Sequence, residues 1–150
     1  MFTGGFFQHY IILIPGLAWI ITQSAKILIE KRWKYVEVWT DLFKSGGMPS
    51  AHSSFVLALT TAIGLKEGIY SSLFALSLSF SAIVVYDAMH VRNEAGKHAT
   101  VLNQIFKEHK ITDLEIKKMF PLENSIGHTP LQAMIGALCG IILGLGFFYL

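Results

Sequence analysis

Four long apolar segments, with nearly all of the charge in the connections between them, constrain the fold of this chain most strongly. The segments cover residues 6–29, 49–65, 69–86 and 130–150. A helix that crosses a bilayer needs roughly 20 mostly apolar residues, and lipid cannot satisfy the backbone groups of an open sheet edge. We therefore expect an all-α fold, a polytopic membrane four-helix bundle.

Composition narrows the class of protein further. Of the 150 residues, 53% are hydrophobic and 15% are charged, whereas a soluble domain is usually about 25% charged. These values argue against an ordinary soluble domain, a disordered chain and a nucleic-acid-binding protein. The length suits a single domain, residues 1–150. The one cysteine, Cys139, excludes an internal disulfide and a metal site built from several cysteines.

The connections predict one or two further helices. Residues 66–68 suit a tight turn, which makes the second and third segments a hairpin. In the long connection 87–129, residues 101–108 place apolar side chains at helical spacing among polar ones. We expect this amphipathic helix to lie at the membrane surface. A second interfacial helix is expected from Thr112, which has capping-box spacing to Glu115.

The basic residues are distributed very unevenly. Eleven of the twelve Lys and Arg residues lie in or beside the first and third connections, and Lys66 alone lies on the second. Four spans put the two basic connections on one face of the membrane. The positive-inside rule places that face in the cytoplasm and both termini outside. We expect a multi-pass protein of a bacterial plasma membrane.

The start of the second segment carries the strongest local signal for chemistry. Gly46 and Gly47 let the backbone turn and approach a ligand closely, and Pro49 suits the first turn of a helix. The free N–H groups of a helix start favour an anion. Ser50 can donate a hydrogen bond there, and His52 can exchange a proton near neutral pH. The simpler alternative is a helix start with a histidine at the interface.

A second signal lies at the start of the fourth segment. Thr129 followed by Pro130 predicts an N-cap and a first helical residue, so His128 lies at another positive helix end. Steps of four residues lead from His128 to Gln132 and then along a glycine stripe: Gly136, Gly140 and Gly144. We expect His128 and Gln132 to point into the bundle, and the glycines to serve close helix packing.

Charged residues mark the ends of the first and third segments. An unpaired carboxylate is costly at the position of Asp87, and Arg92 is suited to bind a phosphate with two hydrogen bonds. The alternative is an interfacial Asp87–Arg92 ion pair. Lys26 either extends to the interface or reaches an anion held between the helix ends.

Four spans bring Lys26, His52, Arg92 and His128 to one membrane face from four helices. Two histidines can divide the roles of nucleophile and acid. Phosphoryl transfer depends mostly on positioning and charge neutralisation, which cations supply. Since no acidic cluster forms an obvious metal site, the reaction need not involve a metal or another cofactor.

These motifs together resemble a known family. Pro49-Ser50-Ala51-His52 is similar to the Pro-Ser-Gly-His motif of the superfamily of type-2 phosphatidic acid phosphatases and vanadium-dependent haloperoxidases. Its divergent branch comprises small membrane proteins described as acid phosphatase/vanadium-dependent haloperoxidase-related. The chain resembles this branch between about Gln23 and Gly140. The motifs that carry the resemblance are Ser45 to Ser53, Tyr86-Asp87-Ala88 with Val91-Arg92 and Ala95-Gly96, and Gly127-His128-Thr129-Pro130.

The resemblance implies an integral membrane lipid phosphatase. By motif, His128 would attack phosphorus to form a phosphohistidine, and His52 would protonate the leaving oxygen. Ser50, with nearby N–H groups, and Lys26 would bind the phosphate. Prenyl diphosphates, polyprenyl phosphates and glycerophospholipid phosphates all fit as substrates at the cytoplasmic surface.

The chain departs from the superfamily pattern at several positions. Leu122 stands in place of an arginine and Gln132 in place of an aspartate. Topology suggests that Arg92 replaces the missing arginine and that Asp87 replaces the missing aspartate. We therefore assign Asp87 to catalysis with the two histidines. To phosphate binding we assign Lys26, Ser50, Arg92, Gly46, Gly47 and Gln132.

Two alternatives stay open. The lost motif residues suit a non-catalytic lipid-phosphate binder, a carrier or a membrane scaffold with a degenerate site. His90, Glu94 and His98 are spaced by four residues and suit a zinc site on one helix face. A bundle of four spans with limited burial is also compatible with a homodimer.

Overall fold

The computed structural model describes residue 6 and residues 10–29, 46–109, 114–124 and 126–150. These residues form helices joined by turns and loops, and none of them lies in a strand. The all-α fold is therefore confirmed. Most of the first basic connection lies outside the described residues, as does the helix start expected at Thr112.

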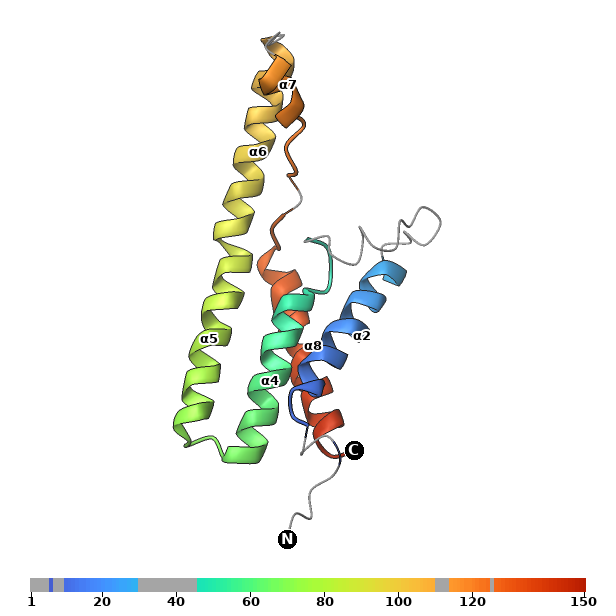
Figure 1. Cartoon of the computed structure of the whole chain (residues 1–150), viewed down its shortest axis with the longest axis vertical. Coiled ribbons are helices and arrows are strands. Elements are labelled where there is room, and N and C mark those ends of the chain that lie inside the picture. The colour runs from blue at the N-terminus through green and yellow to red at the C-terminus, as the bar shows by residue number, and fades with distance from the viewer. Residues whose placement is uncertain (1–5, 7–9, 30–45, 110–113, 125) are drawn as a thin grey trace.

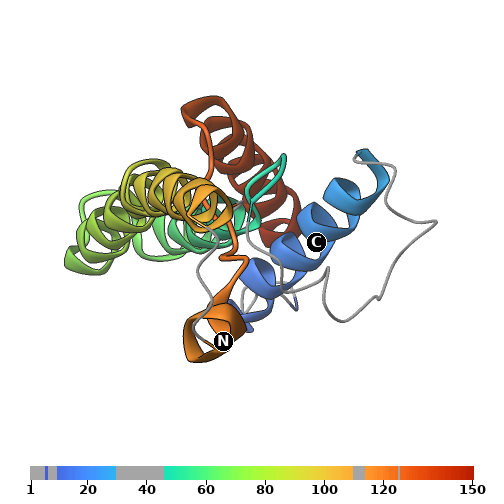
Figure 2. The ribbon, with the colours of Figure 1, turned by 90° about the horizontal axis from the view of Figure 1, so that it is seen from above.

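Four helices make up the bundle, as Figure 1 and Figure 2 show: α2 (Leu13–Ile29), α4 (Ala51–Glu67), α5 (Ser72–Met89) and α8 (Pro130–Phe148). The central helix is α4, which contacts the other three, and α2 also packs on α8. The last three helices begin and end within three residues of the expected bounds. The first begins later than expected, because the chain enters α2 through a turn in which Leu13 N–H bonds to Tyr10 O at 2.8 Å.

Two described helical stretches, Ser72–Glu108 and Pro130–Phe148, are long and apolar enough to cross a membrane, and α2 is shorter. The central helix α4 is also short, with 17 residues, and it carries several hydroxyl groups. These groups bond to neighbouring helices inside the bundle. Thr22 Oγ1 donates to Ser54 Oγ at 2.8 Å, and Thr60 Oγ1 lies 2.8 Å from Ser81 Oγ. Partners of this kind let a polar helix occupy the middle of an apolar bundle.

The glycine stripe of α8 packs directly on α4, as expected. A Cβ at Gly136 would collide with the backbone of Ser50, and one at Gly140 with the backbone of Ser54. At Gly144 a Cβ would lie 2.9 Å from the carbonyl oxygen of Ala58. Only glycine permits the two helices to approach this closely, so the stripe fixes the register of α8 on α4.

The expected amphipathic helix is present, but its direction differs from the one we expected. Helix α6 (Val91–Glu108) continues the direction of α5 beyond the bundle instead of turning across its end (Figure 1). The hydrogen-bond ladder passes through the junction, since His90 N–H bonds to Tyr86 O and Glu94 N–H bonds to His90 O, both at 2.9 Å. The short helix α7 (Leu114–Met119) lies beside the far end of α6.

The chain returns from α7 to α8 along α6. Asn103 holds this return segment with two hydrogen bonds to the backbone of Leu122, at 2.9 and 2.8 Å. The rings of Phe106 and Phe120 stack with their centroids 4.3 Å apart. Closer to the bundle, a Cβ at Gly127 would collide with the backbone of Asn93. The start of α8 is therefore pressed against the start of α6.

Candidate active site

One end of the bundle gathers the ends of four helices. Figure 1 shows the last turn of α2, the first turn of α4, the last turn of α5 and the first turn of α8 at the same end. This arrangement brings Lys26 of α2, His52 of α4, Arg92 at the start of α6 and His128, just before α8, to that end. The topological expectation for these four residues therefore agrees with their placement.

His128 is held by three segments of the chain. Its backbone N–H donates to Ala88 O, at the end of α5, at 3.1 Å. Its ring atom Nδ1 lies 3.0 Å from the carbonyl oxygen of Gly47. The side chain of Gln132, in the first turn of α8, acts on the pKa of the ring in the raising direction. The residue is 3% exposed, so the imidazole is fixed in position, as expected for a side chain that points into the bundle.

The Gly47 contact determines which ring nitrogen of His128 carries the proton. A carbonyl oxygen can only accept, so Nδ1 is the donor and Nε2 keeps its lone pair in the neutral ring. Burial lowers the pKa of the His128 imidazole below its ordinary value of 6.5, although the Gly47 carbonyl opposes this shift. The positive charges of His52 and Lys26 lower it further. His128 is therefore a neutral imidazole near pH 7, with the tautomer that a nucleophile at Nε2 requires.

The glycine pair before α4 presents carbonyl groups to the site. Gly46 and Gly47 have φ angles of 95° and 81°, which residues with a Cβ rarely adopt. In this conformation the Gly46 carbonyl accepts a hydrogen bond of 2.9 Å from Lys26 Nζ, and the Gly47 carbonyl faces His128. The pair thus positions the lysine and the histidine, whereas the sequence suggested N–H groups turned toward an anion.

Ser50 is the N-cap of α4, and the expectation that Pro49 opens this helix is wrong. The hydroxyl of Ser50 accepts from Ser53 N–H at 3.4 Å and from Ser53 Oγ at 3.1 Å. Its N–H donates to Gln132 O at 3.2 Å, and the residue is 0% exposed. Ser50 therefore joins α4 to α8 and has no surface open to a ligand in this conformation.

The start of α8 follows the expected pattern. Thr129 is the N-cap, and its hydroxyl accepts from Gln132 N–H at 3.4 Å. In return the Gln132 side-chain oxygen accepts from Thr129 N–H at 2.9 Å, which completes a capping box. Gln132 thus orders the helix start and contacts His128 at the same time.

Asp87 and Arg92 form the ion pair that was one of the two sequence interpretations. Arg92 Nε donates to Asp87 Oδ2 at 2.7 Å, with both side chains partly exposed. The carboxylate therefore engages Arg92, while a backbone carbonyl occupies the orienting position on His128. Both members of the pair also act electrostatically on His52.

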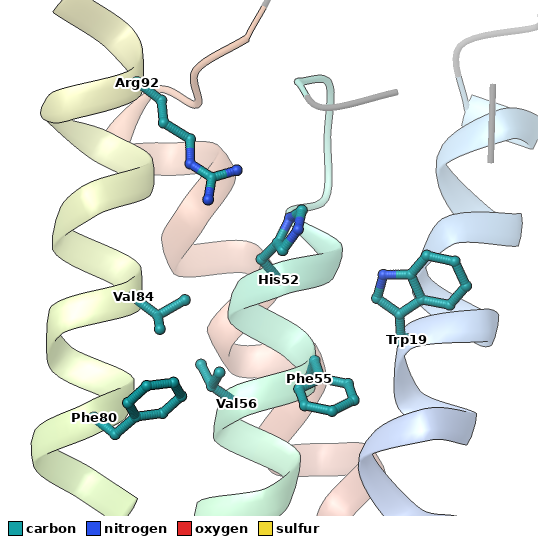
Figure 3. Close-up of a pocket in the computed structure, with 7 residues that line it drawn as sticks. All are labelled: Trp19, His52, Phe55, Val56, Phe80, Val84 and Arg92. Carbon is teal, nitrogen blue, oxygen red and sulfur yellow. The ribbon is translucent and has the colours of Figure 1, made fainter. Parts of the chain in front are cut away.

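A pocket of about 430 Å³ opens beside these groups, between α2, α4 and α5. Figure 3 shows the guanidinium of Arg92 directed toward His52 at its charged end. The rest of the lining, within the described part of the chain, is apolar or aromatic: Trp19, Phe55, Val56, Phe80 and Val84. The sequence interpretation missed these walls. Helical spacing could have predicted part of them, since Phe55 and Val56 follow His52 by three and four residues and so lie on the same face of α4.

The described residues give no support to the zinc alternative. No group of three His, Cys, Asp or Glu residues among them is arranged to hold a metal ion. The ring of His90 stacks on Tyr86, with centroids 4.3 Å apart. Glu94 pairs with Lys97 at 2.6 Å. The spacing of these side chains on α6 is therefore explained by local contacts.

Comparisons with known proteins agree with the motif resemblance. The model of the Divergent PAP2 family matches residues 7–143. The chain is 38% identical to the protein named Uncharacterized membrane protein YuiD of Bacillus subtilis (strain 168), over 147 residues that cover 91% of this chain and 93% of the relative. No solved structure matches the chain. The family match includes every residue of the site and ends within α8, and the chain belongs to the Divergent PAP2 family.

Proposed function

We propose that this membrane protein is a lipid phosphatase, which hydrolyses a lipid phosphate or diphosphate at the cytoplasmic face through a phosphohistidine. The observation that carries the proposal is the hydrogen bond between His128 Nδ1 and Gly47 O. It leaves Nε2 with a lone pair in a ring that is held rigidly among cations. Catalytic histidines that act as nucleophiles need this arrangement of tautomer and orientation.

In the first step, Nε2 of His128 attacks phosphorus. A nitrogen–phosphorus bond forms, and the bond from phosphorus to the ester oxygen breaks. His52, exposed at the pocket, donates a proton to the departing oxygen, which leaves as an alcohol, or as a phosphate when the substrate is a diphosphate. Water then attacks the phosphohistidine, His52 accepts the proton from that water, and inorganic phosphate is released with His128 regenerated.

Positive charge supports both steps. The guanidinium of Arg92 is directed toward His52, where it can bind phosphate oxygens through its terminal amino groups while Nε stays on Asp87. Lys26 adds charge from the last turn of α2, next to Gly46. Asp87 acts through Arg92 by fixing its orientation. We infer the same membrane orientation as from the sequence, with this basic end of the bundle in the cytoplasm.

A second candidate, a non-catalytic lipid-phosphate binder, is favoured by one specific observation. His128 is 3% exposed and does not belong to the lining of the pocket, which consists of other residues. A ligand seated in the pocket as it stands meets Arg92 and His52 first. The enzyme therefore requires the phosphate to penetrate past His52 to Nε2, and the binder does not.

The variant His128→Asn separates the two candidates. An asparagine amide can place its N–H₂ group where Nδ1 lies, so the hydrogen bond to Gly47 is kept while Nε2 is lost. We expect phosphate release from detergent-purified protein to fall by about 1,000-fold or more, with binding of the lipid phosphate retained. The matched control His98→Asn changes an exposed histidine on α6 and should leave release unchanged.

The substrate panel should include a prenyl diphosphate, a polyprenyl phosphate and phosphatidic acid, each with and without a chelator. Release that resists the chelator and disappears in His128→Asn supports the phosphohistidine route. Equal release by His128→Asn and the unmodified protein contradicts it. Lipid binding without release by either protein favours the binder.

A further inference from the structure

The pocket beside His52 also indicates which kind of lipid phosphate the site accepts. We infer that the ligand carries its phosphate directly on a hydrocarbon chain, as a prenyl phosphate does, and not on glycerol. The inference rests on the proposed function in that it takes the same site to hold the phosphate. It goes further because the proposed chemistry alone admits both classes of lipid.

The pocket has one charged end and long apolar walls. Arg92 and His52 form the charged end, and Figure 3 shows them above the other lining residues. Phe55 and Val56 lie about one helical turn, roughly 5 Å, further along α4. Phe80 and Val84 of α5 face them. A ligand whose phosphate meets Arg92 therefore places its next few atoms among hydrocarbon side chains.

The hydroxyl groups near the pocket are not available to such a ligand. Ser53 and Ser54 follow His52 directly in α4, but both are 0% exposed. Ser53 Oγ donates to Ser50 Oγ at 3.1 Å, and Ser54 Oγ accepts from Thr22 at 2.8 Å. Among the lining residues that the structure describes, the indole N–H of Trp19 is the one side-chain hydrogen-bonding group away from the charged end.

This chemistry discriminates between the two lipid classes. A glycerol-based phosphate carries ester carbonyls, and in a lysolipid also a hydroxyl, within a few bonds of phosphorus. One donor cannot satisfy these groups, and a buried polar group left without a partner weakens binding by about tenfold or more. A prenyl or alkyl phosphate has no polar atom beyond the ester oxygen, so the walls match it along its length.

The exposure of α5 shows how the chain of such a lipid reaches the pocket. Phe80 lines the pocket and is also 57% exposed, so the pocket opens sideways along α5. Ile83, on the neighbouring outer face, is 66% exposed. Because the helical stretch Ser72–Glu108, which begins with α5, is long and apolar enough to cross a membrane, this opening faces the hydrocarbon of the bilayer. A single flexible chain can therefore enter from the membrane while the phosphate stays at Arg92.

The test compares hexadecyl phosphate with palmitoyl lysophosphatidic acid, which carry saturated chains of equal carbon number but differ in the glycerol ester. We expect kcat/KM for hexadecyl phosphate to be higher by about tenfold or more, and farnesyl phosphate to behave in the same way. Val84→Thr adds a hydroxyl to the pocket wall. It should lower the ratio of kcat/KM for hexadecyl phosphate to kcat/KM for the lysolipid by about threefold. The matched control Ile83→Thr, outside the pocket, should leave the ratio unchanged. Equal values for the two lipids, or a preference for the lysolipid, overturn the inference.

Binding of the same two lipids to His128→Asn, measured by titration calorimetry in detergent, separates this inference from the proposed function. Tighter binding of hexadecyl phosphate, with no phosphate release by the unmodified protein, would contradict the proposed phosphatase activity and support the preference for a phosphate on a hydrocarbon chain. Turnover of both lipids at equal rates would support the phosphatase activity and contradict the preference for a phosphate on a hydrocarbon chain. Equal binding of the two lipids to His128→Asn also contradicts the inference, whatever the turnover.

Discussion

The starts of α4 and α8 are built from the same parts in opposite arrangements. Each has a hydroxyl N-cap and a histidine nearby, and in each the cap accepts a 3.4 Å hydrogen bond from the N–H three residues on. At α4 the cap, Ser50, is 0% exposed and the histidine, His52, is exposed. At α8 the cap, Thr129, is exposed and the histidine, His128, is 3% exposed.

This reversal gives the two histidines different chemistry. His128 precedes its cap, so it points back into the junction between helices, where Gly47 and Ala88 hold it. His52 follows its cap by two residues, so it points into the pocket beside Arg92. A buried ring with one fixed tautomer suits covalent attack, and an exposed ring suits proton exchange with a leaving group or water.

The difference between the two histidines predicts a large loss of phosphatase activity in His52→Asn. Loss of a general acid typically lowers the rate by about 100- to 10,000-fold, and His52 is exposed, so the fold should survive. The loss should shrink with p-nitrophenyl phosphate, whose leaving group departs without a proton. His128→Asn should remain inactive with both substrates. Equal losses for His52→Asn with both substrates would contradict the assignment of the acid role.

A smaller effect should follow from separating the two helix starts. In Gly136→Ala the new Cβ collides with the backbone of Ser50, and overpacking of this kind costs about 1–3 kcal/mol. Gly146→Ala is the matched control, because nothing lies within 4 Å of a Cβ there. Thermal unfolding in detergent should show a lower midpoint for Gly136→Ala only. Equal midpoints would mean that α8 does not pack on Ser50 as described.

The two N-cap residues, Ser50 and Thr129, should contribute differently to the free energy of unfolding. Removal of an N-cap hydroxyl costs about 1 kcal/mol, and Ser50→Ala also leaves the buried Ser53 hydroxyl without its partner. Ser50→Ala should therefore lower the free energy of unfolding more than Thr129→Ala does. Since Ser50 is 0% exposed, KM should change little. A raised KM with unchanged stability would show that the Ser50 hydroxyl binds the phosphate directly.

The smallest effect concerns the dependence of stability on pH. Burial lowers the pKa of His128 below 6.5 in the folded protein, so the unfolded chain binds a proton at higher pH than the folded one does. The contribution of His128 to stability is therefore present above pH 6.5 and falls as the pH falls toward the lowered pKa. The unfolding midpoint should drop less between about pH 7.5 and 5.5 in His128→Asn. An equal drop would contradict the buried neutral ring.

Much of the fold follows from local sequence patterns. Apolar length placed α4, α5 and α8 within three residues of their observed ends. The four-residue glycine spacing on α8 identified the packing face, and Thr129 with Pro130 identified the start of that helix. Each of these features depends on residues close together in the sequence, so a single chain is enough to reveal it.

The parts of the site that were missed depend on distant segments or on backbone direction. The sequence Gly46-Gly47 shows that the backbone can turn, but not that its carbonyls face Lys26 and His128. A competing cap at Ser50 kept Pro49 out of α4. The pocket walls come from three helices, so the local spacing of Phe55 and Val56 after His52 reveals only part of them. The direction of α6 depends on unbroken hydrogen bonding through His90.

The location of the covalent phosphate tests the roles of the two histidines most directly. The protein would be mixed with a prenyl phosphate, quenched within milliseconds in base, where phosphohistidine persists, and digested for mass spectrometry. We expect phosphate on the peptide that contains His128 and none in His128→Asn. Turnover with phosphate on His52, or turnover without any phosphohistidine, would contradict the roles that burial assigns to the two histidines.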